Sequence, residues 1–237
     1  MKLDDIKKLQ QKKYRNELRH FLVEGEHLIL ELQKAARHNT ALQASELLVT
    51  EAYEHWDSPF KTTLINSKQL AQISDTKTPQ GIIAVAPFFS LTATPARAIY
   101  LHEIQDPGNL GTILRSLAWF GGFRCLLSSG SVDPYNPKVV RASMGAIFHV
   151  PLELDVDIHS LNTPFHQIAY LDMQGKPLRD DAFKRCDCYI FGNEARGIPH
   201  SDLAALNAQA FTIPGSGTIE SLNLASAVNL CVYELMR

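Results

Sequence analysis

The chain has 237 residues, 45% of them hydrophobic, and a formal net charge of −2. This length fits one large or two modest domains, and the composition is that of an ordinary globular protein. No run of about 18 apolar residues is present, so a membrane-spanning helix is not expected, and the charged residues 1–11 contain no apolar core of a secretion signal. Of the four cysteines, three lie in apolar strand or helix patterns, which indicates reduced, buried thiols in a cytoplasmic protein.

Short strands and helices alternate through the first 86 residues. The hydrophobic pattern predicts helices at residues 3–19, 25–37, 52–56 and 68–73, and strands at residues 21–24, 46–50, 61–65 and 82–86. Ser67 is expected to cap the helix that follows it. This order predicts a small α/β or α+β module, which we place at residues 1–87. Residues 88–97, which are rich in Ser, Thr and Pro, are predicted to be a linker.

A second α/β domain is predicted at residues 98–237. Strands are expected at residues 98–104, 123–127, 148–152, 167–171, 188–191 and 210–213, and helices at residues 110–120, 138–143, 161–165 and 222–236. Asn109 is expected to cap the first of these helices, and Gly121 is expected to end it. The alternation of strands and helices predicts a parallel sheet that is covered on both faces.

Two glycine-rich loops follow short apolar strands in the last quarter of the chain, at residues 191–197 and 212–223. They carry Glu194, Ser221 and Asn223, which are polar side chains that a plain turn does not need. In open α/β sheets, ligands bind in the crevice beyond the carboxyl ends of the strands. The two loops are therefore predicted to form one site.

Several familiar catalytic motifs are absent from the sequence. There is no G-x-G-x-x-G after a strand, no Walker P-loop, no G-x-S-x-G elbow and no H-E-x-x-H among the nine histidines. Cys186 and Cys188 lie in a strand pattern without a second pair, so no metal site is expected. These absences exclude most hydrolase, nucleotidase and dehydrogenase interpretations. Because the whole chain is nearly neutral, the basic residues 2–19 are interpreted as a solvated helix face in preference to a nucleic-acid contact.

Each polar candidate also has an ordinary structural interpretation when it is taken alone. Arg115 could be a surface residue paired with an acid, or a guanidinium that grips a phosphate as a fork. Asn109 could be only a helix cap and Glu194 only a surface acid. Ser221 could cap the last helix, with Asn223 in its first turn. The shared placement of these residues beyond strand ends favours a functional site.

Three ordered motifs in residues 98–237 resemble those of the SpoU (TrmH) family of RNA ribose 2′-O-methyltransferases. Residues 106–115 are similar to the first signature, residues 192–197 to the second, G-x-E-x-x-G, and residues 213–224 to the third. Residues 131–146 also match members that act on large RNAs. The first domain is similar to the L30e-like substrate-binding module that precedes the catalytic domain in many members, through residues 21–25 and 78–81.

The resemblance implies an α/β fold whose C-terminal segment is threaded into a deep trefoil knot, a rare feature that no periodicity would predict. It also implies S-adenosylmethionine as the methyl donor and a homodimer with cofactor pockets near its interface. The expected activity is methylation of a ribose 2′-hydroxyl in RNA. Ribosomal RNA is the preferred target and transfer RNA the alternative.

The family motifs also imply roles for particular residues. Asn109 and Glu194 are expected to hold the catalytic arginine, Arg115, and the substrate ribose, while Ser221 and Asn223 shape the active loop. A guanidinium is effectively always protonated. We therefore expect Arg115 to grip the neighbouring RNA phosphate, which would take the proton. Backbone and apolar contacts with the cofactor are expected from Gly192, Asn193, Ile213 and Leu222.

Other interpretations stay open. A non-enzymatic RNA-binding or ribosome-assembly protein could use the same fold, and uptake of S-adenosylmethionine would distinguish the enzyme from it. An unrelated α/β enzyme acting on a small molecule would be expected to carry a glycine-rich nucleotide loop in its first strand–helix unit, which this sequence lacks. Lys138 and Arg141 could contact RNA phosphate or form a solvated helix face, and Arg196 is an extra cation in the second motif.

Overall fold

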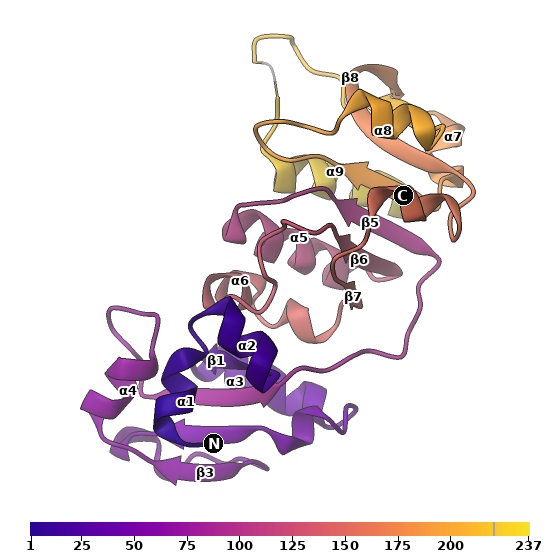
Figure 1. The fold of residues 1–237 in the computed structure, drawn as a ribbon. Coiled ribbons are helices and arrows are strands. Elements are labelled where there is room, and N and C mark those ends of the chain that lie inside the picture. The colour runs from indigo at the N-terminus through magenta and orange to yellow at the C-terminus, as the bar shows by residue number, and fades with distance from the viewer. Residues whose placement is uncertain (220) are drawn as a thin grey trace. The chain divides into compact units, whose positions relative to one another are not determined.

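The computed structural model describes residues 1–219 and 221–237. The chain divides into two compact units (Figure 1). Unit 1 comprises Met1–Leu91 together with Asp133–His149, and unit 2 comprises Thr92–Val132 together with Val150–Arg237. Unit 1 is therefore assembled from two stretches that are not contiguous in the sequence.

Unit 1 is built on a four-stranded sheet in the order β1-β4-β2-β3. Strands β1 and β2 each pair antiparallel with β4, and β2 pairs parallel with β3. This mixed sheet agrees with the small module predicted from the sequence. The elements of unit 1 are α1 (Leu3–Lys8), α2 (Lys12–Leu18), β1 (His20–Glu24), α3 (Glu26–Ala36), η1 (Leu42–Ala44), β2 (Glu46–Val49), η2 (Glu51–Tyr53), β3 (Lys61–Leu64), α4 (Ser67–Ile73), β4 (Ile82–Pro87), α6 (Pro137–Ser143) and η3 (Ala146–Phe148).

The two faces of the unit 1 sheet are covered by different segments. On one face, Leu22 of β1 packs with Leu9, just beyond α1, and with Leu70 of α4. The preceding residue, Phe21, points to the opposite face because side chains alternate along a strand. Its ring lies 4.8 Å from the ring of Tyr135. The second stretch of unit 1 therefore completes the core on that face.

A buried ion pair joins α2 to the residues that precede α6. The side chain of Arg15 is only 2% exposed and lies 2.6 Å from the carboxylate of Asp133. Another guanidinium nitrogen of Arg15 donates to the carbonyl oxygens of Leu9 and Gln10, both at 2.8 Å. Because a charge taken out of water needs a partner, this pair ties the two stretches of unit 1 together.

Three predictions for the first stretch of unit 1 are wrong in detail. The helix expected at residues 3–19 is two short helices, α1 and α2, separated by residues 9–11, and the helix expected at residues 52–56 is the 3₁₀ turn η2. The cap of α4 is Asn66 and not Ser67. Asn66 accepts from the backbone N–H of Gln69 at 2.9 Å, and the side chain of Gln69 accepts from the backbone N–H of Asn66 at 3.0 Å. This reciprocal pair is a capping box.

Unit 2 contains a six-stranded sheet in the order β10-β8-β9-β5-β6-β7, and every pair in it is parallel. The predicted α/β fold with a parallel sheet is confirmed. The elements of unit 2 are β5 (Arg97–Leu101), α5 (Pro107–Phe120), β6 (Phe123–Leu127), β7 (Leu152–Glu153), η4 (Ile158–Asn162), β8 (Ile168–Pro177), α7 (Asp181–Arg185), β9 (Cys188–Phe191), α8 (His200–Ala205), β10 (Gln209–Thr212) and α9 (Leu224–Met236).

One face of this sheet carries a cluster in which Tyr100 of β5 and Ile190 of β9 pack with Leu161 of η4 and Leu203 of α8. Ile99 of β5 is buried on the opposite side of the sheet. Helix α5 packs on β6, and α5 and α9 pack against each other. Because all six strands are parallel, their carboxyl ends lie along one edge, where a ligand site is expected.

The strand predicted at residues 148–152 is mostly wrong. Residues 146–148 form the 3₁₀ turn η3, and only residues 152–153 form the strand β7. Pro151 has no N–H to donate to a sheet, so pairing begins after it. Helices α7 and α8 were not predicted, and the helix predicted at residues 161–165 is the 3₁₀ helix η4, which starts three residues earlier.

All four cysteines are free and buried, which includes the three expected from their apolar patterns. Burial raises the pKa of the Cys186 thiol to about 11 and that of Cys125 to about 12. These thiols therefore stay protonated at neutral pH. Among the helices of the described residues, none is long and apolar enough to cross a bilayer.

Candidate active site

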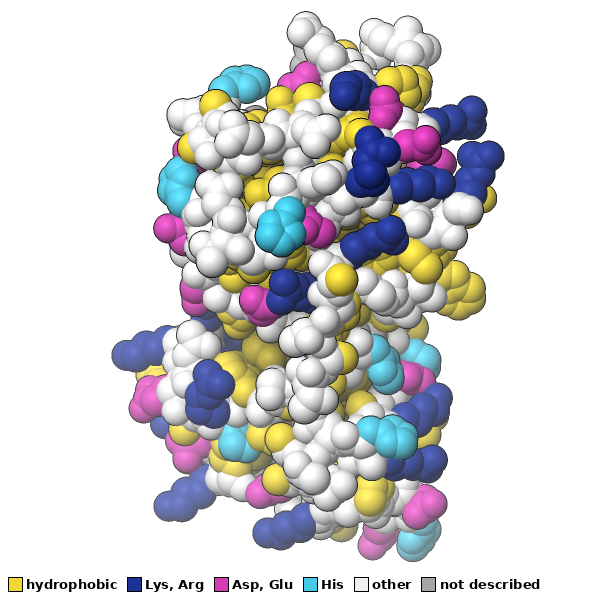
Figure 2. All heavy atoms as spheres, turned by 90° about the vertical axis from the view of Figure 1, so that its right-hand side faces the viewer, with side chains coloured by type: hydrophobic (Ala, Val, Ile, Leu, Met, Phe, Trp, Pro, Cys, Tyr) yellow, Lys and Arg dark blue, Asp and Glu magenta, His cyan; other side chains and the backbone are white. Residues whose placement is uncertain are grey.

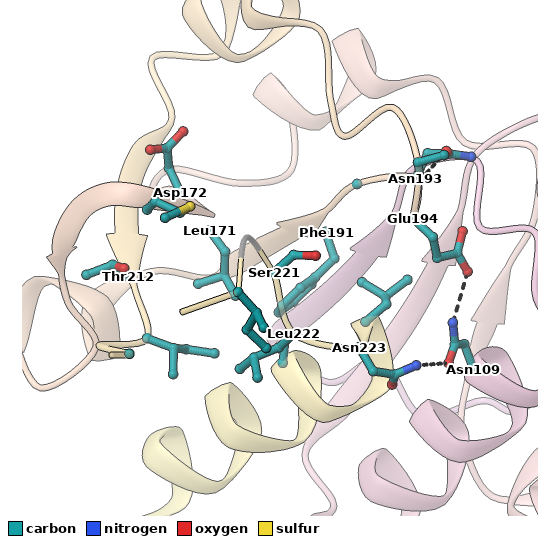
Figure 3. A pocket seen from close by; sticks show the side chains of 18 of the residues that line it. Asn109, Leu171, Asp172, Phe191, Asn193, Glu194, Thr212, Ser221, Leu222 and Asn223 are labelled. Carbon is teal, nitrogen blue, oxygen red and sulfur yellow. Dashed lines mark hydrogen bonds between the residues drawn. The ribbon is translucent and has the colours of Figure 1, made fainter. Parts of the chain in front are cut away.

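A cavity of about 1000 Å³ opens in unit 2 at the carboxyl ends of the strands. Its walls are the residues that follow β5, β9 and β10, the part of β8 just beyond its pairing with β9, and the start of α9 (Figure 3). The two glycine-rich loops therefore meet at one cavity. The loop after β5, which is far from both in the sequence, joins them there.

The start of α5 places Asn109 at the cavity. Asp106 caps this helix, because its Oδ1 accepts from the backbone N–H of Asn109 at 2.7 Å, and Pro107 occupies the first helical position. The prediction that Asn109 is the cap is therefore wrong. Since Asp106 does the capping, the side chain of Asn109 is available to face the cavity.

Glu194, from the loop after β9, is held by three hydrogen bonds. Its carboxylate accepts from the side-chain amide of Asn109 at 3.1 Å. It also accepts from the backbone N–H groups of Gln105 at 3.2 Å and Asp106 at 3.3 Å. Those N–H groups immediately precede α5, and the N-terminus of a helix favours a negative charge. The carboxylate is thus fixed over the first turn of α5.

Asn223 connects α9 to the same group of residues. Its side-chain oxygen accepts from the backbone N–H of Ser226 at 3.2 Å, so Asn223, and not Ser221, caps α9. Its side-chain amide donates to the Oδ1 of Asn109 at 2.9 Å. A continuous chain of hydrogen bonds therefore runs from Glu194 through Asn109 to Asn223 (Figure 3).

The loop after β9 is a tight structure held by Asn193 and Gly197. Their backbones bond in both directions, at 3.1 Å and 2.9 Å. A Cβ atom on Gly192 would lie 2.6 Å from the carbonyl carbon of Gly197, so there is no room for a side chain. The buried side chain of Asn193 donates to the carbonyl oxygen of Glu103 at 2.8 Å. Arg196 pairs with the Glu103 carboxylate at 2.5 Å, which anchors the loop a second time.

The loop after β10 supplies Ile213, Ser221 and Leu222 to the cavity wall. Figure 3 shows Leu222 in the cavity, with Leu171 and Phe191 also in the wall, so this part of the wall is apolar. Within the described residues, Ser221 makes no side-chain hydrogen bond to the Glu194–Asn109–Asn223 chain. All four residues expected to contact a cofactor, including Gly192 and Asn193, line the cavity.

Arg115 does not line the cavity within the described part of the chain. Its side chain is exposed on α5. Thr112 and Trp119, three residues before it and four residues after it, are also exposed, so the three share one stripe of the helix. A single chain thus brings Asn109, Glu194 and Asn223 together but leaves Arg115 outside.

The charged side chains in the cavity wall are all acidic. They are Asp106, Asp172 and Glu194, and among the described residues the wall contains no Lys, Arg or His. A cavity with this lining suits a ligand that carries positive charge. In residues 1–219 and 221–237, no three His, Cys, Asp or Glu side chains are grouped so that they could hold a metal ion.

Several residues of the cavity wall were not predicted from the sequence. Gln105 follows the predicted strand and was not predicted as a site residue, although its backbone N–H donates to Glu194. Leu171, Asp172 and Met173 come from β8, and Thr212 ends β10. The signal that could have identified Asp172 is its position directly after the predicted strand at residues 167–171, where an acidic side chain follows a buried run.

Lys138 and Arg141, candidates for phosphate contacts, lie on α6 in unit 1. Arg141 pairs with Asp75 at 2.7 Å, so its charge is partly neutralised. Lys138 is exposed, and no carboxylate of the described residues lies within 4 Å of its ammonium group. Lys138 therefore has a charge available for an RNA phosphate, whereas the charge of Arg141 is already paired with Asp75.

Comparison with known proteins covers both parts of the chain. A family model described as "SpoU rRNA Methylase family" matches residues 96–233, and one described as "MRM3-like substrate binding domain" matches residues 2–84. The first covers more than half of the chain and includes every residue of the cavity described above.

Similar proteins match over two thirds of the chain or more. The 23S rRNA (guanosine(2553)-2′-O)-methyltransferase RlmP of Bacillus subtilis is 30% identical over 99% of this chain and 95% of its own length. A 23S rRNA (uridine(2479)-2′-O)-methyltransferase of Streptomyces viridochromogenes is 29% identical over 67% of this chain and 61% of its own length. The crystal structure of an AdoMet-bound rRNA methyltransferase from Sinorhizobium meliloti superposes with a TM-score of 0.82 and 25% identity, over 98% of this chain and 93% of that one.

Proposed function

The chain belongs to the SpoU rRNA methylase family, and from that premise we propose which of its residues carry out the reaction and on which RNA. It is an S-adenosylmethionine-dependent methyltransferase that acts on a ribose 2′-hydroxyl of RNA. We propose that the target is large-subunit ribosomal RNA, because two relatives are named for sites in 23S rRNA. We place the enzyme in the cytoplasm, where free thiols persist.

The cavity fits S-adenosylmethionine in size and charge. Ligand pockets commonly run from roughly 300 to 1,000 Å³, and this one measures about 1000 Å³. Its wall contains Asp172 and Glu194 and, among the described residues, no cationic side chain, which suits a donor with a positive sulfonium centre. We propose that backbone groups of Gly192, Asn193 and Ile213 and the side chain of Leu222 hold this donor. When it is bound, it supplies an activated methyl group.

The observation that carries this assignment is the hydrogen-bonded chain of Glu194, Asn109 and Asn223 at the cavity. It joins three loops of unit 2 through side chains that are not needed merely to form turns. We propose that it fixes the ribose so that its 2′-oxygen faces the donor. Correct positioning of reacting groups can supply about 7–11 kcal/mol of a barrier. Ser221 would shape the loop that bears Leu222.

We propose that Arg115 acts in the cavity of the partner subunit of a homodimer. The cavity has no cation of its own among the described residues, and Arg115 is exposed and outside it in the same chain. A guanidinium stays protonated, so Arg115 would grip an RNA phosphate as a fork. That phosphate oxygen would lie next to the 2′-hydroxyl and receive its proton.

The surface around Arg115 supports a dimer. Trp119 on α5 is 85% exposed, and Tyr233 on α9 is 57% exposed. Phe120 and Tyr233 meet edge to face, with ring centroids 6.3 Å apart, so the apolar surfaces of α5 and α9 are continuous. An exposed apolar surface of this kind marks an interface. A partner on this face would bring its own α5 and Arg115 with it, since a two-fold dimer uses the same surface on both chains.

We also propose that the C-terminal segment is threaded into the trefoil knot that the family resemblance implies. The path of the chain supports this: β10 pairs with β8 at one edge of the sheet, yet α9, which follows it, packs on α5. A crystal structure in which the C-terminal segment passes outside the preceding loops would contradict the knot.

We propose that the first module, predicted at residues 1–87, captures RNA and that residues 98–237 react with it. The match of residues 2–84 to a substrate-binding family supports this division. On the face shown in Figure 2, the Lys and Arg side chains that gather toward the upper right belong to unit 2, and over unit 1, in the lower part, both signs of charge are interspersed. RNA must therefore be recognised by local contacts and shape as much as by net charge.

The decisive experiment maps 2′-O-methyl groups in the ribosomal and transfer RNA of cells with and without this protein. Loss of one methyl group from large-subunit rRNA, restored by the wild-type chain and not by Glu194→Ala, is the expected result. Loss from a transfer RNA instead would move the target to that class. An unchanged map, together with no uptake of S-adenosylmethionine in calorimetry, would overturn the assignment.

A further inference from the structure

Positive charge is concentrated in the first two helices of unit 1. Residues 2–19 contain seven Lys or Arg residues and three Asp or Glu residues, a net charge of +4, whereas the whole chain has a net charge of −2. Such a local excess within a chain of opposite sign is the electrostatic feature expected of a surface that binds nucleic acid.

Part of this charge is already neutralised within unit 1. Lys7 pairs with Asp4 at 3.6 Å, and Lys8 pairs with Asp5 at 2.9 Å. Arg15 is buried against Asp133. The remaining cations are exposed and have no carboxylate of the described residues within 4 Å; they are Lys2, Lys12, Lys13 and Arg19.

Tyr14 lies among these cations. Its ring is partly exposed on α2. The ammonium groups of Lys8 and Lys13 lie 5.8 Å and 5.6 Å from the centre of this ring. Cations interleaved with an aromatic ring are the arrangement by which proteins hold single-stranded nucleic acid, with phosphates on the cations and a base stacked on the ring.

A neighbouring loop extends this surface. The side chain of Gln10, between α1 and α2, donates to the carbonyl oxygens of Ile73 at 3.1 Å and Ser74 at 3.0 Å. Lys77 follows on the same loop, exposed and with no carboxylate of the described residues within 4 Å. The surface that we call the α1–α2 face consists of Lys8, Lys12, Lys13 and Tyr14, and Lys77 lies on the loop that Gln10 contacts.

We propose that the α1–α2 face binds a single-stranded segment of the RNA substrate, with Lys12 and Lys13 on its phosphates and Tyr14 stacked against one unpaired base. This inference rests on RNA as the substrate of the proposed function. It revises the interpretation of residues 2–19 as a merely solvated helix face. Lysines at 5.6–5.8 Å from the ring can move to the flanking phosphates when a base takes their place.

The test uses the full-length dimeric protein and deproteinised ribosomal RNA from cells that lack it. Lys12→Gln/Lys13→Gln is compared with Lys34→Gln/Arg37→Gln. The second pair removes the same charge from α3 and the residue after it, and α3 packs on unit 1 away from α1 and α2. The Lys12/Lys13 variant is expected to bind RNA more weakly, and the slope of log affinity against log salt should fall by about 0.7 for each lost phosphate contact. The control pair should keep the wild-type slope.

Tyr14 is tested with Tyr14→Phe and Tyr14→Leu. Tyr14→Phe keeps the ring and should bind RNA as the wild type does, whereas Tyr14→Leu should lose about 5- to 150-fold in affinity. Uptake of S-adenosylmethionine and the thermal midpoint should be unchanged in every variant, which excludes a folding defect.

If the Lys12/Lys13 variant binds RNA with the wild-type affinity and salt slope, the α1–α2 face does not bind RNA. The same conclusion follows if the control pair loses as much affinity as the Lys12/Lys13 variant. Equal RNA affinity of Tyr14→Leu and Tyr14→Phe would show that no base stacks on the ring of Tyr14. The proposed function fails in a different way, because a wild-type protein that takes up S-adenosylmethionine but methylates no RNA would refute it whatever these variants do.

Discussion

The side chains of Asn223 and Asn109, which are 114 positions apart in the chain, are joined by a hydrogen bond of 2.9 Å. Asn223 caps α9, and Asn109 lies in the first turn of α5, so this contact fixes the starts of two helices to each other. Asn109 in turn donates to Glu194 at 3.1 Å. The amide of Asn109 accepts from Asn223 through its oxygen and donates to Glu194 through its nitrogen, which neither a carboxylate nor an ammonium group could do.

The first prediction follows from this geometry. Asn109→Asp keeps the size of the side chain but replaces its donor with a carboxylate that faces Glu194. Repulsion should displace the loop, and a misplacement of about 1 Å can cost about 100-fold in rate. Single-turnover methylation of rRNA measures the rate, and calorimetry measures binding of S-adenosylmethionine. Asn207→Asp makes the same change at an exposed position of unit 2 outside the cavity and is the control. Equal rates for Asn109→Asp and the wild type would show that the chain of hydrogen bonds is dispensable.

The second prediction concerns Arg115 and the proposed homodimer. Arg115→Ala and Glu194→Ala chains should each be inactive alone. If Arg115 acts in the partner's cavity, mixed dimers of the two should regain one intact site, and random mixing should restore about a quarter of wild-type activity. Mixing that restores nothing would place Arg115 in its own subunit or outside the reaction.

Arg115→Lys separates charge from shape. It keeps the positive charge but loses the planar fork that binds a phosphate through two donors. A fall of about tenfold or more in single-turnover rate, with unchanged uptake of S-adenosylmethionine, is expected if the fork is needed. Arg179→Lys, an exposed arginine of unit 2, is the matched control. A wild-type rate for Arg115→Lys would exclude forked recognition.

A third prediction compares two glycines of the cavity wall. A Cβ on Gly192 would meet the backbone of Gly197 at 2.6 Å, whereas a Cβ on Gly215 would meet nothing within 4 Å. Gly192→Ala should therefore force the loop apart, lower the free energy of unfolding by about 1–3 kcal/mol, and weaken uptake of S-adenosylmethionine. Gly215→Ala should leave both unchanged. Chemical denaturation and calorimetry provide the two readouts, and similar behaviour of the two variants would contradict the packing of this loop.

A fourth prediction tests the buried ion pair of unit 1. Arg15→Met leaves the carboxylate of Asp133 buried without its partner, and breaking such a pair costs about 3–5 kcal/mol. Denaturant unfolding of the full chain should show this loss. Lys34→Met removes a cation from an exposed pair with Glu31 and should not shift the midpoint. Equal midpoints for Arg15→Met and the wild type would mean that Asp133 finds water or another donor.

The fifth prediction is a pH dependence. Burial raises the pKa of Cys186 from 9.0 to about 11 and that of Cys125 from 9.0 to about 12. Above pH 9 the unfolded chain loses these protons while the folded chain keeps them, so stability that is complete below about pH 9 should fall between pH 9 and 12. Urea midpoints at pH 8 and pH 10.5 measure the fall, which should be smaller in Cys186→Ala. Iodoacetamide should label no cysteine of the native protein at pH 8 and all four in denaturant.

Much of the fold could be predicted because its signals are local. Short apolar runs ended by Gly or Pro located β6, β9 and β10 to within one residue at each end. Their alternation with helices correctly predicted a parallel sheet. The cavity could be anticipated because polar residues such as Glu194 and Asn223 follow strand ends, and parallel strands place those ends along one edge.

The remaining features depend on contacts between distant segments. Asp106 caps α5, and the side chain of Asn109 instead donates to Glu194, which is 85 positions away in the chain. The contribution of Asp172 depends on how far β8 continues beyond its pairing with β9. The hydrogen bond between Asn109 and Glu194 and the length of β8 have no periodicity that could reveal them, although the position of Asp172 directly after an apolar run is a local signal.

The interleaved construction of unit 1 limits how this enzyme can be rearranged. The segment Asp133–His149 completes the core around Phe21 and carries Asp133, the partner of Arg15. If residues 1–91 were produced alone, the apolar face around Phe21 would be exposed and the guanidinium of Arg15 would have no carboxylate partner. A recognition module of this kind cannot be exchanged between enzymes by a single cut at the linker. A chimera or a recombination event that replaces residues 1–91 must also replace residues 133–149. The two stretches are therefore expected to be inherited together.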